Sequence, residues 1–208
     1  MLLKSKIRFI LFFLISINQA FAFAQNSKKI KALKKINTVE QAEAFINKNG
    51  TTSARIGNFN RIIDSVEYKE IKAAFRVGDI FFDKRLIYKI IGNEEEPLFR
   101  CEYIVFDGNK ISKNTIDSLR SEIIKQYRSG VFFKSLAKQY SIDGRLSQGN
   151  SGWFRTSKMG QEFCDELDSM EIGDIYLYDD SVKKNYYIVL KTHAVLCADS
   201  WVFVACSF

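Results

Sequence analysis

The 208-residue sequence is long enough for one or two domains, and its 47% hydrophobic and 14% aromatic content can fill a substantial core. This composition excludes an intrinsically disordered chain. The formal charge of +7 comes from basic residues interleaved with acidic ones, without an arginine-rich or aromatic RNA-reading motif, so we expect no nucleic-acid partner.

Residues 1–24 have the three-part pattern of a secretory signal peptide. A basic start precedes an apolar run, residues 9–17, and small residues follow at Ala20, Ala22 and Ala24. This pattern predicts cleavage after Ala22 or Ala24 and a periplasmic or secreted protein. The apolar run is much shorter than the roughly 20 residues of a membrane-spanning helix, so we expect no stable membrane span in the mature form.

Residues 25–97 are predicted to form a small α/β accessory region. Its first, basic stretch, residues 26–35, is expected to be mobile. Thr38 and Gln41 have the spacing of a capping box, which predicts a helix over residues 39–48. Strands are predicted where β-branched and aromatic residues gather, at 80–82, 86–91 and 99–106. Pro97 follows three glutamates and marks the predicted end of the region.

The pattern from residue 98 to 193 predicts a second domain. Ser112 or Asn114 can cap an amphipathic helix that ends at Gly130. The elements predicted after it are a helix over 132–140, a polar loop over 144–152, a short strand at 153–154, a helix over about 163–170, and strands at 175–178 and 186–192. This order predicts an α+β fold, a small and mainly antiparallel sheet covered by helices.

Cysteine content leaves the disulfide pattern open. In an oxidising compartment Cys101, Cys164, Cys197 and Cys206 allow three pairings, and buried unpaired thiols are the alternative. The apolar tail, residues 194–208, is either an added strand, with Cys197 and Cys206 as a possible staple, or an irregular end. The sequence has no C-x-x-C pair and a single histidine, His193, so we expect neither a metal site nor thiol redox chemistry.

Five local patterns of the second half resemble the parvulin, or PpiC-type, family of peptidyl-prolyl cis/trans isomerases, in the order and spacing of that family. They are Phe132–Ser141 (family F-x-x-L-A-x-x-Y-S), Gly149–Phe154 (G-G-D-L-G-W-F), Met159 with Phe163 (M-x-x-x-F), Glu171–Ile175, and the closing strand Tyr186–Thr192. The resemblance covers residues 99–193. It implies a parvulin-like domain that works without a cofactor on unfolded or extended, proline-containing polypeptides.

The resemblance also implies roles for particular residues. Phe154, Met159 and Phe163 would hold the proline ring, although apolar residues at helical spacing are also typical of an ordinary core. Asp143 would lie near the carbonyl group of the reacting bond, and the alternative is a loop aspartate that caps the next turn.

The sequence departs from the family at three places. Tyr103 and Tyr187 replace the two family histidines, and they either keep a hydrogen-bonded pair or indicate a domain that binds peptide without efficient catalysis. Asn150-Ser151 replaces Asp-Leu, which would remove one apolar wall of the pocket. We retain Tyr103 and Tyr187 with Asp143 as the candidate catalytic group.

Two functions follow from these patterns. The first is an exported prolyl isomerase that assists the folding of envelope or secreted proteins. The second is a non-catalytic, peptide-binding chaperone with a degenerate parvulin domain. In the second function, four phenylalanines of the accessory region would supply much of the binding surface: Phe59, Phe75, Phe81 and Phe82. The alternative is that these four residues form a separate small core. The sequence does not determine the oligomeric state.

Overall fold

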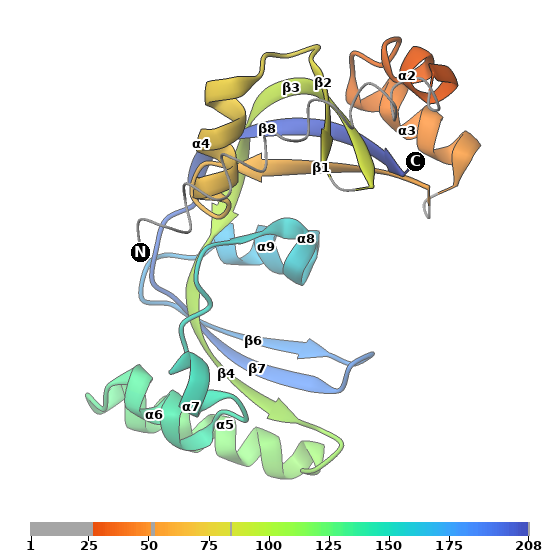
Figure 1. Ribbon diagram of the computed structural model, residues 1–208. Coiled ribbons are helices and arrows are strands. Elements are labelled where there is room, and N and C mark those ends of the chain that lie inside the picture. Colours follow the sequence, from red (N-terminus) through yellow and green to blue (C-terminus); the bar gives the residue numbers. More distant parts are fainter. Residues whose placement is uncertain (1–26, 51–52, 84, 208) are drawn as a thin grey trace. The chain divides into compact units, whose positions relative to one another are not determined.

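The computed structural model describes residues 27–50, 53–83 and 85–207, and the predicted signal peptide lies outside them. The chain forms two compact units (Figure 1). Of the described residues, unit 1 combines those from 27 to 95 with those from 199 to 207, and unit 2 comprises Glu96–Ala198. Among the described helices, none combines the length and the apolar character needed to cross a bilayer.

Unit 1 is built on one sheet with strand order β1-β8-β3-β2 (Figure 1). Its strands are β1 (Ala54–Asn60), β2 (Ile80–Asp83), and the parts within this unit of β3 (Leu86–Phe99) and β8 (Leu196–Ser207). Its helices are α2 (Ser27–Leu33), α3 (Val39–Asn49) and α4 (Ser65–Ala74). The carboxyl-terminal segment thus pairs with β1, antiparallel, in register from Ala54↔Cys206 to Asn60↔Ser200.

Strand alternation divides unit 1 into two apolar cores. Successive side chains of a strand point to opposite faces, so Val202 and Val204 pack with α2 and α3, and Trp201 and Phe203 pack with α4. Phenylalanines 59, 75 and 81 join the α4 core, and Phe82 joins the other. These four residues therefore belong to a separate core, as one of the two interpretations proposed, and do not form an exposed peptide-binding surface.

One expectation for unit 1 is wrong, and two of its elements were not predicted. Residues 27–33 form helix α2 instead of a mobile stretch, because Ile30 and Leu33 are buried against the sheet. The sequence patterns also missed β1 and α4. Strand β3 runs through Pro97 and continues to Phe99. Proline is tolerated where a strand changes partners, and beyond Pro97 the residues of β3 pair with β5.

A buried lysine holds the end of α2. The Lys89 ammonium group donates to the Lys34 carbonyl oxygen at 3.0 Å and to Asn37 Oδ1 at 2.9 Å. Lys89 lies on the face of β3 that α2 covers, between the apolar residues Ile87 and Ile91. Burial lowers the pKa of Lys89. The interaction supplies a cation where the helix carbonyl groups lack partners.

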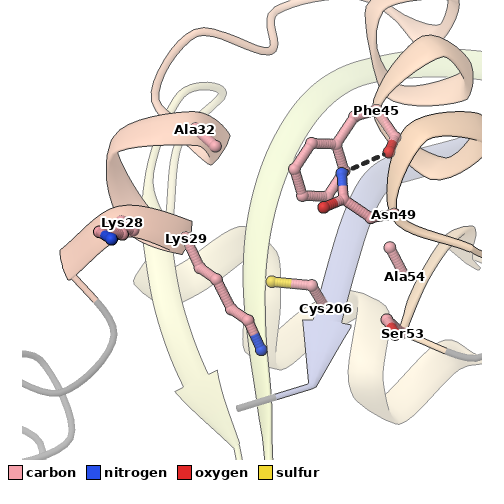
Figure 2. Close-up of a pocket in the computed structure, with 8 residues that line it drawn as sticks. All are labelled: Lys28, Lys29, Ala32, Phe45, Asn49, Ser53, Ala54 and Cys206. Atoms are coloured by element: carbon pink, nitrogen blue, oxygen red, sulfur yellow. Dashed lines mark hydrogen bonds between the residues drawn. The ribbon is translucent and has the colours of Figure 1, made fainter.

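Unit 1 also encloses a small pocket of about 250 Å³ (Figure 2). Its lining residues are Lys28, Lys29, Ala32, Phe45, Asn49, Ser53, Ala54 and Cys206. Figure 2 shows Lys29 extended towards the end of β8, where its ammonium group donates to the Ser207 carbonyl oxygen at 2.7 Å. The Asn49 amide group donates to the Phe45 carbonyl oxygen at 2.7 Å. Two polar groups of the lining are therefore already engaged with the chain's own carbonyl groups.

Unit 2 confirms the predicted α+β fold. A three-stranded antiparallel sheet, order β4-β7-β6, consists of β4 (Cys101–Asp107), β6 (Ile175–Asp180) and β7 (Asn185–Lys191). Its helices are α5 (Lys113–Arg128), α6 (Phe133–Tyr140), α7 (Gly144–Ser147), α8 (Thr156–Met159) and α9 (Gln161–Ser169). The short strand β5 (Phe154–Arg155) pairs with the end of β3.

The two faces of this sheet have different neighbours. Ile104, Phe106 and Ile188 share a core with α5 and α6, whereas Val189 and Tyr187 pack with Phe163 of α9. Ser112 caps α5, as one of the two candidates proposed, through its hydroxyl group and the Thr115 amide. The predicted polar loop over 144–152 is wrong at its start, where the short helix α7 forms.

Arg120 joins α5 to the β6–β7 hairpin. The side chain is only 3% exposed, and its Nη2 donates to the carbonyl oxygens of Tyr178 at 3.0 Å and Tyr187 at 2.9 Å. The same atom lies 2.7 Å from an Asp179 carboxylate oxygen. Burial alone would raise the pKa of Asp179, but hydrogen bonds from Arg120 and Lys113 outweigh it and lower that pKa.

We expect Arg120→Met to reduce the free energy of unfolding of unit 2 by about 2–3 kcal/mol, because two carbonyl groups and a carboxylate lose their donor. The exposed Arg128 on the same helix provides the control, and Arg128→Met should change stability by less than about 0.5 kcal/mol. Urea denaturation followed by Trp153 fluorescence, in a common Trp201→Phe background, measures both. Equal stabilities of the two variants would contradict the prediction.

All four cysteines are free in the structure, and only Cys197 is exposed. Cys197 and Cys206 both lie on the extended strand β8, about 30 Å apart at the usual rise per residue, so they do not form a staple. Burial raises the pKa of the Cys101 thiol to about 11 and also raises the pKa values of Cys164 and Cys206. A buried, protonated thiol reacts slowly.

A chromogenic thiol reagent should therefore label one cysteine of the native protein within minutes at pH 8, and all four after unfolding in guanidinium chloride. Cys197→Ser should remove the rapid native reaction and leave three slow thiols. Rapid native labelling of two or more cysteines would show that the buried thiols open readily to solvent.

Candidate functional site

One pocket of unit 2, about 230 Å³ in volume, is lined by all six residues that the sequence analysis assigned to the site. They come from six different segments: Tyr103 of β4, Asp143 before α7, Phe154 of β5, Met159 of α8, Phe163 of α9 and Tyr187 of β7. Seven further residues complete the lining: Cys101, Val105, Ile142, Ser151, Lys158, Asn185 and Val189. The structure therefore brings together residues that lie up to 84 positions apart in the sequence.

The pocket lies on the face of the sheet opposite α5 and α6. Tyr103 and Val105 alternate with the core residue Ile104 along β4, and Tyr187 and Val189 alternate with Ile188 along β7. Because Tyr103 pairs with Val189 and Val105 with Tyr187, these side chains share one face. The alternating pattern of two strands is sufficient to place them together.

Aromatic rings form the apolar side of the pocket. The ring centroids of Phe154 and Phe163 are 6.2 Å apart, and Tyr178 meets Phe163 edge-on at 5.0 Å. Phe154 and Phe163 are only 3% and 2% exposed, so most of each ring belongs to the core of unit 2. Met159 is half-buried and packs against the same cluster. The three residues are thus core residues that also contribute part of their surface to the pocket.

Hydrogen bonds form the polar side of the pocket. The Tyr103 hydroxyl group donates to Asp143 Oδ2, and the Ser141 hydroxyl group donates to Asp143 Oδ1 at 2.7 Å. Burial, with the nearby Asp143 carboxylate, raises the pKa of Tyr103 to about 12. The tyrosine therefore keeps its proton at neutral pH and serves as a donor. Asp143 occupies the N-cap position of α7, but its side chain makes no capping hydrogen bond, so the turn-capping alternative is wrong.

The two tyrosines make a ring contact. The ring centroids of Tyr103 and Tyr187 are 6.3 Å apart, with the planes tilted by 60°. Within the described part of the chain no hydrogen bond joins them, because Tyr103 gives its proton to Asp143. The hydrogen-bonded pair considered from the sequence is therefore not formed. Burial raises the pKa of Tyr187, which keeps this second phenol neutral as well.

The segment that carries Asp143 is attached to the outer edge of β4. At one end the Ile142 amide donates to the Val105 carbonyl oxygen at 3.0 Å, and the Val105 amide donates to the Ser141 hydroxyl oxygen at 3.0 Å. Further along, the Tyr103 amide donates to the Gly149 carbonyl oxygen at 2.7 Å. These bonds satisfy the edge of β4 that β7 leaves unpaired.

Ser151 completes this attachment at the other end of β4. Its hydroxyl oxygen accepts from the Cys101 amide at 3.0 Å, and its own amide donates to the Cys101 carbonyl oxygen at 3.1 Å. From the sequence, Ser151 was expected only to remove an apolar side chain from the pocket wall. In the structure it joins the segment to β4 through two hydrogen bonds, and one of them needs the serine hydroxyl group, which the family's leucine lacks.

Two glycines allow the segment to pack closely. A Cβ atom at Gly144 would lie 2.0 Å from the Ala137 carbonyl oxygen of α6. Gly149 has φ +80°, and a Cβ atom there would lie 2.7 Å from Ala137 Cβ and 3.1 Å from the Tyr103 carbonyl oxygen. The sequence shows these glycines but not the surfaces that they approach, which depend on how the segment packs against α6 and β4.

Six of the lining residues were not identified from the sequence: Cys101, Val105, Ile142, Lys158, Asn185 and Val189. Ile142 is an exposed apolar residue beside Asp143, and Lys158 places its ammonium group 5.6 Å from the centroid of the Phe154 ring. Lys158 could have been identified from the sequence, because it directly precedes the predicted pocket residue Met159. His193 does not line the pocket and instead packs edge-on against Trp153 at 5.5 Å. In the part of the chain that the structure describes, no cluster of His, Cys, Asp and Glu is suited to a metal ion.

We expect Gly144→Ala to destabilise unit 2 by at least about 2 kcal/mol, because the new methyl group meets a backbone carbonyl group that cannot move alone. Gly92→Ala is the control, since the nearest atom to its Cβ is a Glu94 side-chain oxygen at 3.5 Å. Thermal unfolding monitored by circular dichroism compares the two. If Gly144→Ala were as stable as the wild type, the segment around Gly144 would be able to move away from α6 without a loss of unfolding free energy.

Comparison with known proteins supplies one family. Residues 104–181 match the rotamase family, described as the PpiC-type PPIase domain. No curated protein sequence matches the chain.

Solved structures give weaker likenesses. PrsA from Bacillus subtilis is 25% identical over 46% of this chain and 35% of that chain, with a TM-score of 0.36. NmPin, the parvulin of Nitrosopumilus maritimus, is 25% identical over 47% of this chain and 98% of that chain, with a TM-score of 0.36. A Campylobacter jejuni structure, from work that describes PEB4 and the periplasmic protein Cj1289 as SurA-like chaperones, is 16% identical over 100% of this chain and 69% of that chain, with a TM-score of 0.32. The chain thus spans about a third of the PrsA structure.

Proposed function

The chain carries a PpiC-type PPIase domain, matched over residues 104–181, and we propose that unit 2 catalyses the cis/trans isomerisation of peptide bonds that precede proline. One observation carries this proposal. Asp143 and Tyr103 line the same pocket as the apolar residues Phe154, Met159 and Phe163.

The reaction makes modest chemical demands. An X-Pro bond exchanges over a barrier of about 20 kcal/mol, because rotation removes the resonance of the amide. No covalent bond breaks, so no cofactor is required. Catalysis needs a site that holds the proline ring and binds the twisted amide more tightly than either planar form. An apolar wall beside a fixed polar group meets that requirement.

In this proposal the aromatic side of the pocket holds the proline ring. Phe154 and Phe163 are fixed by the core around them, so the wall is rigid before substrate arrives. Met159 is less buried and has a flexible side chain that adapts to the ring. Binding therefore orders few protein groups and leaves more of the interaction energy for the twisted state.

Asp143 acts on the carbonyl group. A planar amide places partial negative charge on its oxygen, and the twisted amide loses much of that charge. A carboxylate next to the carbonyl oxygen repels the planar form more strongly than the twisted one, which lowers the barrier. Tyr103 and Ser141 hold the carboxylate in place through two hydrogen bonds. Tyr187, which packs against Tyr103, completes the wall beside this group.

One observation favours a second function, a peptide-binding chaperone. Two neutral tyrosines replace the family histidines, and exposed apolar residues flank Asp143, namely Ile142 and Leu146, the latter 92% exposed. A surface of this kind can bind extended apolar peptides without catalysis. The two functions share one pocket and differ in whether exchange is accelerated.

The cellular setting is part of the same proposal. The pattern of residues 1–24 favours export, with cleavage after Ala22 or Ala24. The substrates are then unfolded or extended polypeptides in the periplasm or outside the cell, and the activity assists their folding. Fusing residues 1–30 to a reporter that works only after export would test this part separately.

The test of catalysis is the exchange rate of Ala-Xaa-Pro peptides, measured by NMR exchange spectroscopy with the protein from residue 25 onward. We expect acceleration that falls about tenfold in Asp143→Asn and at least as much in Met159→Ala, since one loses the charge and the other part of the ring pocket. Met159 is chosen because it is less buried than Phe163, so its replacement is less disruptive to the core.

Phe132→Ala is the matched control, because Phe132 is 81% exposed and lies outside the pocket. It should leave the rate unchanged. A folded wild-type protein that binds the peptides without accelerating exchange would exclude the isomerase and support the chaperone. A protein that neither binds nor accelerates would exclude both.

A further inference from the structure

We propose that Lys158 makes the pocket selective for proline segments that carry an acidic side chain beside the proline. The inference rests on the proposed function, because it assumes that the pocket of unit 2 holds the proline. It adds a specificity residue and a substrate class, acidic proline-containing peptides.

The first observation is the position of the ammonium group. Lys158 lies on α8, directly before Met159, and it lines the pocket. Its Nζ is 5.6 Å from the centroid of the Phe154 ring and 3.5 Å from the Ser151 carbonyl oxygen. The face of an aromatic ring attracts a cation, so the charge is held at the rim of the apolar wall.

The second observation is the lack of an acidic partner. In the described ranges no carboxylate lies within ion-pair distance of Lys158. Its neighbour Arg155, in contrast, binds Glu96 at 3.1 Å. The Lys158 ammonium group therefore has only a long contact to a carbonyl group and an aromatic face, and it retains the capacity to bind an anion.

The third observation is the distribution of charge around the pocket. Among the lining residues the only charged side chains are Lys158 and Asp143. The Asp143 carboxylate already accepts from Tyr103 and Ser141, so it is engaged within the protein. An acidic substrate side chain is attracted to Lys158 and repelled by Asp143. On the pocket floor, burial raises the pKa of the Cys101 thiol, and the positive charge of Lys158 acts in the opposite direction and lowers that pKa.

The expected selectivity is moderate. An exposed ion pair contributes little in water, but the pocket wall excludes part of the solvent from one side of Lys158. We therefore expect a preference of about three- to tenfold for glutamate over glutamine, reduced in salt.

The test uses two peptide series, acetyl-Ala-Xaa-Pro-Ala-amide and acetyl-Ala-Ala-Pro-Xaa-amide, with glutamate, glutamine or lysine at Xaa. NMR titration gives Kd at low ionic strength and again in about 0.2 M salt. Glutamate should bind most tightly in at least one series, and that series identifies the side of the proline that meets Lys158. Lys158→Glu should reverse the order and favour lysine. Lys134→Glu, an exposed lysine of α6 outside the pocket, should leave it unchanged.

Two results would overturn the inference while leaving the proposed function intact. In the first, glutamate and glutamine peptides bind equally in both series. In the second, the glutamate preference persists in Lys158→Glu or disappears equally in Lys134→Glu. A folded protein that binds none of the peptides would instead overturn the proposed function, and the selectivity with it.

Discussion

The outer edge of β4 carries the interaction on which the polar side of the pocket depends. Its amide and carbonyl groups bind the segment 141–151 through Ser141, Ile142, Gly149 and Ser151. A strand edge must find partners, and here a loop supplies them where a fourth strand would otherwise lie. The same bonds hold the segment beside Tyr103, and the hydroxyl groups of Tyr103 and Ser141 then position the Asp143 carboxylate.

Other interactions of unit 2 hold the helices and the aromatic side of the pocket against the sheet. Arg120 ties α5 to the β6–β7 hairpin from the face opposite the pocket. On the pocket side, the buried Lys191 of β7 donates to the carbonyl oxygens of Asp168 at 2.9 Å and Met170 at 2.7 Å, which holds the end of α9. Because α9 carries Phe163, this lysine contributes to placing the aromatic wall. Buried cations thus join helices to the sheet by donating hydrogen bonds to backbone carbonyl groups.

Two tyrosines, Tyr103 and Tyr187, determine the chemistry of the pocket floor. A histidine can change its charge near neutral pH, whereas Tyr103 and Tyr187 remain neutral because burial raises both pKa values. In the proposed catalysis, the Asp143 carboxylate and the shape of the pocket act without proton transfer, and the two tyrosines keep their protons.

The sequence by itself determined six of the residues that line the pocket, and only the tertiary structure decided the others and how all of them are connected. Phe154, Met159, Phe163 and Tyr187 lie in short patterns that resemble the parvulin family, and Tyr103 and Asp143 were identified by the places that this resemblance implies. Strand alternation and helix period are also local, so the α+β order of unit 2 was predictable. The contact of Ser151 with Cys101, the approach of Gly144 to Ala137, the Lys158 ammonium group over Phe154 and the pairing of β8 with β1 were not. The Ser151 contact and the pairing of β8 join residues far apart in the chain, and a residue's own sequence neighbours carry no record of a surface brought to it by folding. Gly144 and Ala137, like Lys158 and Phe154, are close in the chain, but their contacts depend on the turn or helix that forms between them.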